Sequence, residues 1–232
     1  MADLIPFMYA DLAAPAATTI FASDAQGPGE VSSSDHGGYG IVAASVDEKV
    51  VTDAWRAGVK PGRSVLRLDG TMGANWKTSR LEAPTVPFTR LGKEILEADW
   101  QVLAAGRWRM NDHITLGEGR AHVRIVQALS SMGAAHGHRI LCLEDNSSIS
   151  AAMTKGRSPA YALNFLCRRR SAASLAAQIT VGTPWVETSA MPAGDASRLR
   201  AEVSRPAPSG QDHRQLHQKV SPSAEALHHV PH

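Results

Sequence analysis

Carboxylates at four points of the sequence together form a candidate site for hard divalent cations. Asp24 follows one short apolar run, Asp145 follows another, and Asp195 comes directly after a Pro-Ala-Gly turn. The fourth acid, Glu118, lies near the start of a segment with helical periodicity. Clustered carboxylates repel one another unless cations neutralise them, and Mg²⁺ prefers oxygen ligands of this kind. Two such ions about 3.5–4 Å apart can activate a water molecule and stabilise the leaving oxygen of a phosphodiester.

An alternation of strands and helices must position these acids. The predicted strands are residues 18–22, 39–46, 100–108, 139–144 and 184–190, and the predicted helices are residues 115–132, residues 158–178 and a last helix that Asp195 opens. The polar, glycine-rich link between the first two strands predicts a hairpin. Strands that alternate with helices late in a chain are typical of an α/β domain with a mixed sheet. Such sheets place their sites at the carboxyl ends of neighbouring strands, under a covering helix.

Glu118 is the acid whose direction the sequence specifies best. Ile125 and Leu129 return to the side of the helix that Glu118 occupies, so its carboxylate points the same way as the apolar face. A carboxylate aimed at the core is costly unless something pairs with it. Gly117 and Gly119 flank it, and glycine weakens a helix by about 1 kcal/mol relative to alanine. Glu118 is therefore a chemically unusual residue in an otherwise ordinary amphipathic segment.

The chain divides into three parts by composition. We expect residues 1–17 to be a lead-in, residues 18–203 to form one α/β domain, and residues 204–232, rich in Pro, Ser, Gln and His, to be disordered. Within the domain, glycines and prolines interrupt residues 47–97, which predicts an irregular insertion with some strand content near residues 49–55.

Composition bounds the class of protein. Of the 232 residues, 43% are hydrophobic and 20% are charged, as in a globular domain, and the low aromatic content of 5% argues against a large aromatic platform for nucleic acid. Cys142 and Cys167 lie in apolar runs without a CxxC pair, so we expect buried thiols in a reducing compartment. No apolar run approaches the roughly 20 residues of a membrane span. The sequence predicts an intracellular protein, cytoplasmic or nuclear, that is not secreted and has no membrane partner.

Six segments occur in the order that one known family shows. They are ASDAQGPG at 22–29, GGYGIV at 37–42, HITLGEGRA at 113–121, CLEDNSS at 142–148, KGRS at 155–158 and MPAGDASRL at 191–199. This set resembles the ribonuclease H domain of reverse-transcribing elements, especially that of DIRS-like, tyrosine-recombinase retrotransposons. The usual patterns there are DAS-x-x-G, HIN-x-LE-x-A, DN and N-x-AD-x-x-SR. The last segment has one residue more than the pattern, Gly194, before Asp195.

The resemblance implies a fold, a site and an activity. The fold is a ribonuclease H-like α/β fold, in which helices flank a mixed five-stranded sheet. Asp24, Glu118, Asp145 and Asp195 match the catalytic, metal-binding acids. The implied cofactor is a pair of Mg²⁺ ions, which Mn²⁺ can replace, and the implied partner is an RNA–DNA hybrid whose RNA strand is cut.

Polar and basic side chains after the third acid are candidates for contact with nucleic-acid phosphates. These are Asn146, Ser147, Lys155, Arg157, Arg168, Arg169 and Arg170. In the resemblance-based interpretation they neutralise phosphates and make binding dependent on salt. The other interpretation is that the charges simply form a solvated helix face and that the serine caps a helix. We expect His113 to pack or cap at the helix entrance.

Two other interpretations stay open at this point. The chain could be a catalytically inactive ribonuclease H-like module, left from a retrotransposon, that binds nucleic acid or a protein. It could also be an unrelated small α/β protein in which the acids are turn and cap residues. The sequence makes no prediction of oligomeric state.

Overall fold

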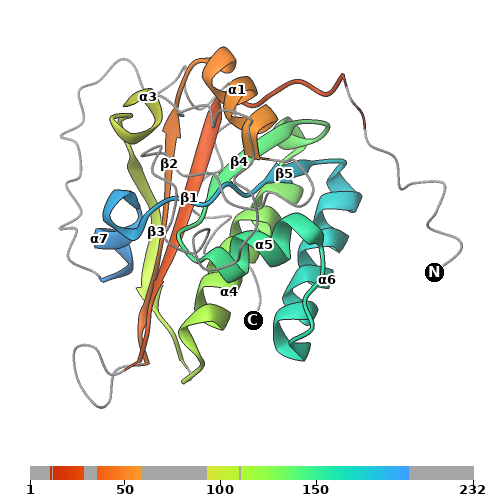
Figure 1. The fold of residues 1–232 in the computed structure, drawn as a ribbon. Coiled ribbons are helices and arrows are strands. Elements are labelled where there is room, and N and C mark those ends of the chain that lie inside the picture. Colours follow the sequence, from red (N-terminus) through yellow and green to blue (C-terminus); the bar gives the residue numbers. More distant parts are fainter. Residues whose placement is uncertain (1–10, 12, 29–35, 59–92, 110, 199–232) are drawn as a thin grey trace, which may run out of the picture.

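The structure of this protein is a computed structural model, which describes residues 11, 13–28, 36–58, 93–109 and 111–198. It has an α/β fold built on one mixed sheet (Figure 1). In the described part the strands are β1 (Thr19–Gln26), β2 (Gly38–Ser45), β3 (Gln101–Arg107), β4 (Arg139–Leu143) and β5 (Thr180–Gly182). The α-helices are α1 (Glu48–Gly58), α3 (Lys93–Leu96), α4 (Ile114–Ser130), α5 (Ser147–Lys155), α6 (Tyr161–Ala177) and α7 (Gly194–Ser197). The five strands lie in the order β3-β2-β1-β4-β5. The predicted α/β class and mixed five-stranded sheet flanked by helices are confirmed.

Strand direction changes across the middle of the sheet. β1 and β2 form the predicted hairpin and pair antiparallel along their whole length, from Thr19↔Ser45 to Gln26↔Gly38. β3 continues the antiparallel half beside β2, whereas β4 and β5 are parallel to β1. The parallel pairing of β1 with β4 ends at Ala22↔Leu143. Beyond this pair β1 and β4 no longer pair, which leaves an opening between the carboxyl-terminal ends of the two strands.

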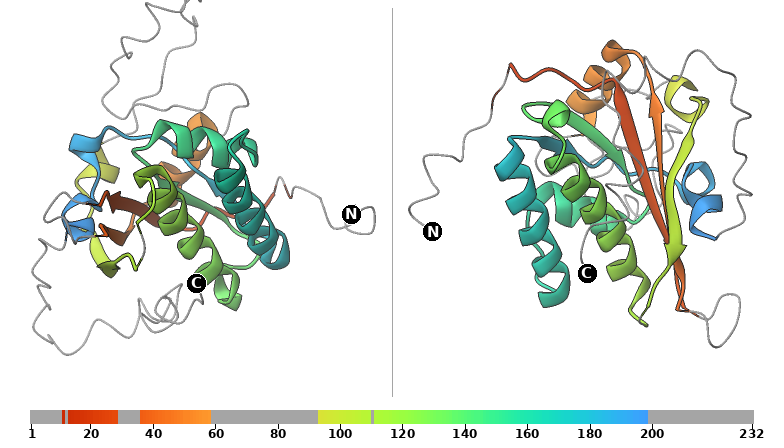
Figure 2. Two further views of the ribbon diagram at one scale, coloured as in Figure 1. Left: turned by 90° about the horizontal axis from the view of Figure 1, so that it is seen from below. Right: turned by 180° about the vertical axis from the view of Figure 1, so that it is seen from behind.

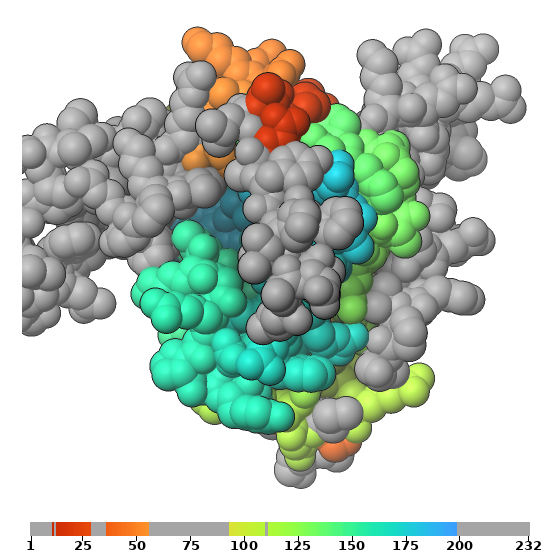
Figure 3. All heavy atoms as spheres, turned by 90° about the vertical axis from the view of Figure 1, so that its right-hand side faces the viewer, coloured from red at the N-terminus to blue at the C-terminus, as the bar shows by residue number. Residues whose placement is uncertain are grey.

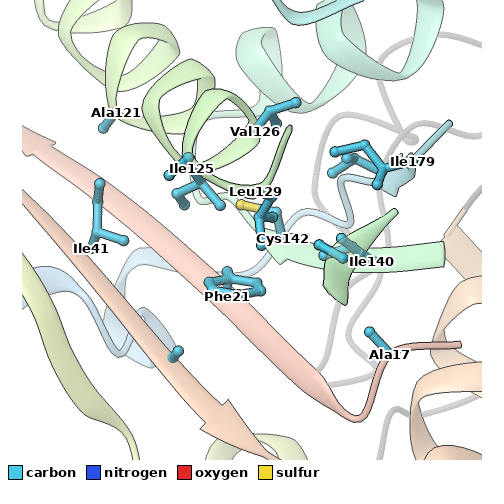
Figure 4. Close-up of a cluster of buried hydrophobic side chains, with 14 of the residues drawn as sticks. Ala17, Phe21, Ile41, Ala121, Ile125, Val126, Leu129, Ile140, Cys142 and Ile179 are labelled. Carbon is cyan, nitrogen blue, oxygen red and sulfur yellow. The ribbon is translucent and has the colours of Figure 1, made fainter. Parts of the chain in front are cut away.

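Different helices pack against the two faces of the sheet. Alternate residues of β1 point to opposite faces, so Ile20 and Ala22 contribute to a core with α1 and α7, and Phe21 contributes to a core with α4. Figure 2 shows α4 and α6 on one side of the strands and α7 on the other. Figure 4 shows the α4 side, where Ile125 and Leu129 of the helix face Phe21 of the sheet. The inward direction predicted for this face of the helix is confirmed.

The strand content expected near residues 49–55 is wrong, because this segment is helix α1. Val51, Ala54 and Trp55 are its buried side chains, and their spacing of three and four residues is that of one helix face. β-branched Val50 and Val51 suggested a strand, but packing against the sheet determines the outcome. The rest of the predicted insertion up to residue 92 lies outside the described residues.

The last predicted strand is also placed wrongly. β5 is Thr180–Gly182, and residues 184–190 hold one isolated bridge, Glu144↔Trp185, and a 3₁₀ turn at Thr188–Ala190. Pro184 lacks the N–H that a ladder needs. A three-residue strand directly after a helix gives too short an apolar run to stand out in the sequence.

Two helices and the first strand differ from the expectation. Helix α5 was not predicted as an element, since only a possible cap by the serines at 147–148 suggested it. The helix expected at 158–178 is α6, continuous through Arg170. Ser158 accepts a hydrogen bond from the Ala160 N–H ahead of the helix. The first strand continues past its predicted end at residue 22, so Asp24 lies inside β1.

The lead-in contacts the domain where the structure describes it. Ala17 N donates to Arg139 O at 2.8 Å, and Ala16 forms a parallel bridge with Arg139, so residues 16 and 17 extend the parallel pairing of β1 with β4 toward the start of both strands. The predicted tail at 204–232 lies outside the described residues. Within the described part, no helix has the length and apolar character to cross a membrane.

Candidate metal centre

Three of the four predicted acids meet at the opening between β1 and β4. Asp24, Glu118 and Asp145 each offer one carboxylate oxygen, and these oxygens lie within 4.8 Å of one another. Asp24 and Glu118 are 5% exposed, and Asp145 is half-buried. Three carboxylates this close, two of them buried and one half-buried, could hold a hard cation. They fit the metal that the resemblance implies, although they do not identify which metal binds.

Strand register positions the two aspartates. Asp24 and Asp145 each lie two residues past the last parallel pair, Ala22↔Leu143. Side chains alternate along a strand, so both acids keep the side of the sheet that this pair occupies. The Asp145 carbonyl accepts a hydrogen bond of 2.6 Å from Trp185 Nε1, which fixes the backbone beyond β4.

Helix α4 brings Glu118 to the aspartates because two glycines allow close packing. A Cβ on Gly117 would lie 3.4 Å from Ala25 Cβ and 3.2 Å from Trp108 Nε1. A Cβ on Gly119 would lie 2.9 Å from Leu166 Cδ1. The glycines weaken the helix locally but let it approach both β1 and α6.

The start of α4 is fixed by a cap. His113 is the N-cap residue, and its Nδ1 accepts a hydrogen bond from Thr115 N at 3.3 Å. The expected capping role of His113 is confirmed. The cap sets the helix start five residues before Glu118, and so fixes which side of α4 presents the carboxylate.

The carboxylates hold their protons unusually tightly. Burial is the largest cause, and together with the negative charge of Asp145 it raises the pKa of Asp24 to about 6 and that of Glu118 to about 8. Burial also raises the pKa of Asp145, against a hydrogen bond from Thr188. A bound cation has the opposite effect, because a nearby positive charge favours the ionised form. The site is therefore electrostatically strained without a cation.

Helix α7 supports Asp24 from the other face of the sheet. Ser197 Oγ donates to Asp24 Oδ2 at 2.5 Å. The helix reaches this position because β2 carries glycines beneath it. A Cβ on Gly40 would lie 2.5 Å from Ser197 N, and one on Gly38 would lie 2.5 Å from Ser197 O. The glycines of β2 thus create the space that places a hydroxyl on the first acid.

Asp195 does not join the group, so its predicted place as the fourth ligand is corrected. Its side chain is exposed, while Ala196 and Ser197 face the sheet. The residue before it occupies the position beside the site, since a Cβ on Gly194 would lie 4.0 Å from Asp24 Oδ2. One residue on a helix is a rotation of about 100°. The extra Gly194 therefore turns the acid away from the cluster.

Arg198 is a site residue that sequence reasoning missed. Its charge lowers the pKa of both Asp24 and Asp145, against the larger effect of burial. The Ser-Arg pair of the final segment carried a signal for it, because the family pattern also ends in Ser-Arg. At this corner α7 offers a hydroxyl and a guanidinium instead of a carboxylate.

A second buried pair lies next to the cluster. Glu144 and His122 are both fully buried, with 3.5 Å between Glu144 Oε2 and His122 Nδ1, and Ser23 Oγ donates to the same Glu144 oxygen at 3.3 Å. Burial raises the pKa of Glu144 well above its ordinary value and lowers that of His122 well below its ordinary value, so burial favours the neutral form of each side chain. Glu144 faces away from the metal ligands, as the alternation along its strand predicts. His122, one turn after Glu118, was missed, although its i+4 position placed it on the same face.

Asn146 and Ser147 begin α5 beside the site. Asn146 caps this helix by accepting hydrogen bonds from Ser148 N and Ile149 N, and it also hydrogen-bonds Glu118, which lowers the pKa of that acid. Ser147 is exposed. The cap after β4 is therefore Asn146, whereas Asp145 is free to act as a ligand.

The predicted basic contacts separate into surface and interior residues. Lys155, Arg157 and Arg168 are exposed and Arg169 is half-buried. Arg170 is buried and donates to the carbonyls of Met153 and Val181. Its predicted role in phosphate contact is corrected, because its guanidinium is turned into the protein.

Comparisons with protein-family models, with curated proteins and with solved structures found no match.

Proposed function

We propose that this chain is a ribonuclease H-like nuclease domain derived from a retroelement, which cuts the RNA strand of RNA–DNA hybrids with divalent metal. One observation carries the proposal: the carboxylates of Asp24, Glu118 and half-buried Asp145 converge within 4.8 Å at the open end of a mixed five-stranded sheet. The ordered segments that resemble the ribonuclease H domains of retrotransposons support the choice of substrate.

Each residue of the centre has a role in this proposal. Asp24, Glu118 and Asp145 bind Mg²⁺, or Mn²⁺ in its place. When bound, a pair of such ions would supply an activated water and positive charge against the 3′ oxygen that leaves the cut strand. Ser197 holds Asp24, and Asn146 holds Glu118, so that their oxygens stay in position.

The surface beside the centre supplies contacts for the hybrid. Lys155 is the last residue of α5, whose start lies at the site, and Arg157 follows this helix, while Arg168 lies on the exposed face of α6. Lysine and arginine on phosphates release counterions, so binding weakens steeply as salt rises.

The test is cleavage of a short RNA–DNA hybrid by the full chain, with Mg²⁺ or with EDTA. We expect cleavage only with Mg²⁺, and loss of cleavage in Asp145→Asn, which keeps the shape of the side chain but removes its charge. Double-stranded RNA and double-stranded DNA serve as substrate controls. Cleavage that persists in EDTA contradicts the proposal.

An inactive module that binds nucleic acid or a protein is the second candidate, and one observation favours it. Gly194 stands where a fourth carboxylate would lie, and the charge of Arg198 acts on the two aspartates. Fewer anionic ligands and a nearby cation weaken a metal site. A folded chain that binds the hybrid but does not cut it, with either Mg²⁺ or Mn²⁺, supports this candidate over the first.

A further inference from the structure

Two aromatic side chains lie uncovered on the outer face of helix α6. Tyr161 is 86% exposed and Phe165 is 53% exposed, whereas Leu163 and Leu166 are buried on the opposite side of the helix. Residues four apart are neighbours on a helix surface, with about 5–6 Å between their Cβ atoms, so the two rings form one patch. Helix α6 lies on the face that Figure 3 turns to the viewer, in teal.

The surface around the two rings is positively charged and contains no acid. Residues 146–186 hold five lysines and arginines and no Asp or Glu. Lys155, Arg157 and Arg168 are exposed, and Arg169 is half-buried. Among the described residues none of these four cations forms an ion pair. A positive surface without its own counter-charge attracts polyanions.

The cations flank the aromatic pair along the chain. Arg168 lies three residues after the second ring, on the same face of α6, and Arg157 lies four residues before the first ring, in the link from α5. Ser158 N donates to Asn164 Oδ1 at 3.1 Å, which attaches this link to α6. The positive charges and the rings therefore belong to one connected surface.

A single strand of nucleic acid matches this combination. It carries one phosphate and one flat base per nucleotide, and in a single strand the base faces are free to stack on aromatic side chains. The two bases of a pair in a hybrid or duplex already stack on their neighbours, so their faces are not available to the rings. Two rings are a small platform, in agreement with the low aromatic content of the chain.

The position of the surface relative to the carboxylate cluster favours DNA as this single strand. Helix α5 begins beside the cluster, at its cap Asn146, and ends at Lys155, about 13 Å further along its axis. Cleavage of the RNA strand of a hybrid leaves the DNA strand unpaired. At about 3.4 Å per nucleotide, roughly four nucleotides of that strand cover the length of α5.

We propose that the outer face of α6 binds single-stranded DNA, whose bases stack on Tyr161 and Phe165 while its phosphates contact Lys155, Arg157 and Arg168. The choice of DNA rests on the nuclease function proposed above, because that reaction exposes the DNA strand. The rings add base stacking to the phosphate contacts that the cations supply.

The test is a titration of a fluorescein-labelled oligothymidylate of about 12 nucleotides with the full chain in EDTA, followed by fluorescence anisotropy. We expect saturable binding, and at least about tenfold weaker binding of an abasic strand of the same length, which keeps the phosphates but has no bases. Tyr161→Ala and Phe165→Ala each raise the dissociation constant at least about fivefold, whereas Phe165→Trp, which keeps an aromatic face, does not. Val102→Ala is the matched control, since it shortens a side chain that is 44% exposed on β3, and it leaves binding unchanged.

Salt dependence separates the rings from the cations. Arg168→Gln removes one phosphate contact, so the slope of log affinity against log salt becomes shallower by about 0.7. Tyr161→Ala weakens binding but leaves this slope unchanged, because stacking releases no counter-ions.

Four results overturn the proposal. Equal binding of the thymidylate and the abasic strand means that charge alone attracts the strand. Equal binding of oligoglutamate means a surface for acidic proteins, and tighter binding of oligouridylate than of thymidylate means a surface for RNA. Unchanged binding by folded Tyr161→Ala and Phe165→Ala variants places the strand elsewhere. Because the titration is done in EDTA, a chain that cuts hybrids can still fail this test, and a chain that passes it can still fail to cut.

Discussion

Helices α4 and α7 border the carboxylate cluster from opposite faces of the sheet, and they bring opposite chemistry to it. α4 is a helix of 17 residues that delivers the carboxylate of Glu118. α7 has four residues and delivers a hydroxyl from Ser197 and the charge of Arg198. The negative ligands therefore come from β1, β4 and α4, while α7 orients Asp24 and offsets part of the charge. We therefore expect that removing the Glu118 carboxylate on the α4 side abolishes cleavage, and that changes on the α7 side alter cleavage only in degree.

The largest expected effect separates Glu118 from Asp195. Glu118→Gln removes one of the three carboxylates proposed to bind metal, and we expect hybrid cleavage to fall about a thousandfold, because a bound metal contributes several kcal/mol to transition-state stabilisation. Asp195→Asn changes an exposed carboxylate outside the group and should leave the rate within about twofold. The measurement is the single-turnover cleavage rate of both variants at saturating Mg²⁺. Equal losses in the two variants would place Asp195 back in the centre.

The pH dependence of stability distinguishes Asp24, which α7 supports, from Glu118, which α4 delivers, because the two carboxyl groups titrate in different pH ranges. Asp24 and Glu118 bind their protons more tightly in the folded protein, with pKa values of about 6 and about 8, than in the unfolded chain, where the reference values are 3.8 and 4.5. Folding is therefore favoured at low pH, and without divalent metal the free energy of unfolding should fall by a few kcal/mol as the pH rises from about 4 to about 8.

Urea unfolding at several pH values, with EDTA or with Mg²⁺, measures this dependence. Mg²⁺ should flatten the curve above pH 6, because it stabilises the ionised carboxylates. Ser197→Ala removes the hydrogen bond that lowers the pKa of Asp24 and should move the lower step to higher pH. A metal-free stability that rises between pH 5 and pH 8 would contradict the assigned burial of these acids.

A smaller effect tests the contact of α7 with the sheet. Gly40→Ala puts a methyl group where Ser197 N lies at 2.5 Å, so α7 must shift, and we expect a loss of about 1–3 kcal/mol in the free energy of unfolding together with weaker Mg²⁺ binding. Gly133→Ala is the matched control, since its added Cβ has no atom within 4 Å. Urea unfolding and calorimetric titration with Mg²⁺ measure both quantities. Equal behaviour of the two variants would mean that α7 does not rest on Gly40.

The smallest expected effect is a gain. Gly194→Asp places a carboxylate next to Asp24, at the position that Asp195 fails to occupy, and should tighten Mg²⁺ binding several-fold, because anionic ligand count sets affinity at such sites. Calorimetric titration against the unmodified chain measures the change. Weaker binding than in the unmodified chain would show that Arg198, 3.3 Å from that Cβ position, governs the corner instead.

The same two helices show what the sequence could predict. The apolar repeat of α4 extends over enough turns to give its bounds within two residues and the inward direction of Glu118. α7 is too short to show an apolar repeat. Which of its side chains face the sheet therefore depends on the contact of Ser197 with Gly40, two residues far apart in the chain. The family pattern placed an acid there, but the added Gly194 shifted the register by one residue.

Other parts of the site depend on tertiary packing, which the sequence alone does not reveal. Asp24 and Asp145 were predicted from the ends of apolar runs, which strand alternation and parallel pairing then brought together. Arg170 lies in a run of three arginines and so suggested a solvated patch, yet the turn of α6 points this one inward. Leu163, Leu166 and Cys167 form the buried face of α6, and Arg170, seven residues after Leu163, continues this face whereas Arg169 does not.

Cleavage of an RNA–DNA hybrid labelled on each strand tests the central claim most directly. With Mg²⁺, the full chain should cut the RNA strand to fragments with 5′-phosphate and 3′-hydroxyl ends, leave the DNA strand intact, and lose this activity in Asp145→Asn. Equal cleavage by the Asp145→Asn variant, RNA ends with a cyclic phosphate, or no cleavage by a folded chain that binds Mg²⁺ would contradict the assignment of Asp24, Glu118 and Asp145 as a catalytic metal centre.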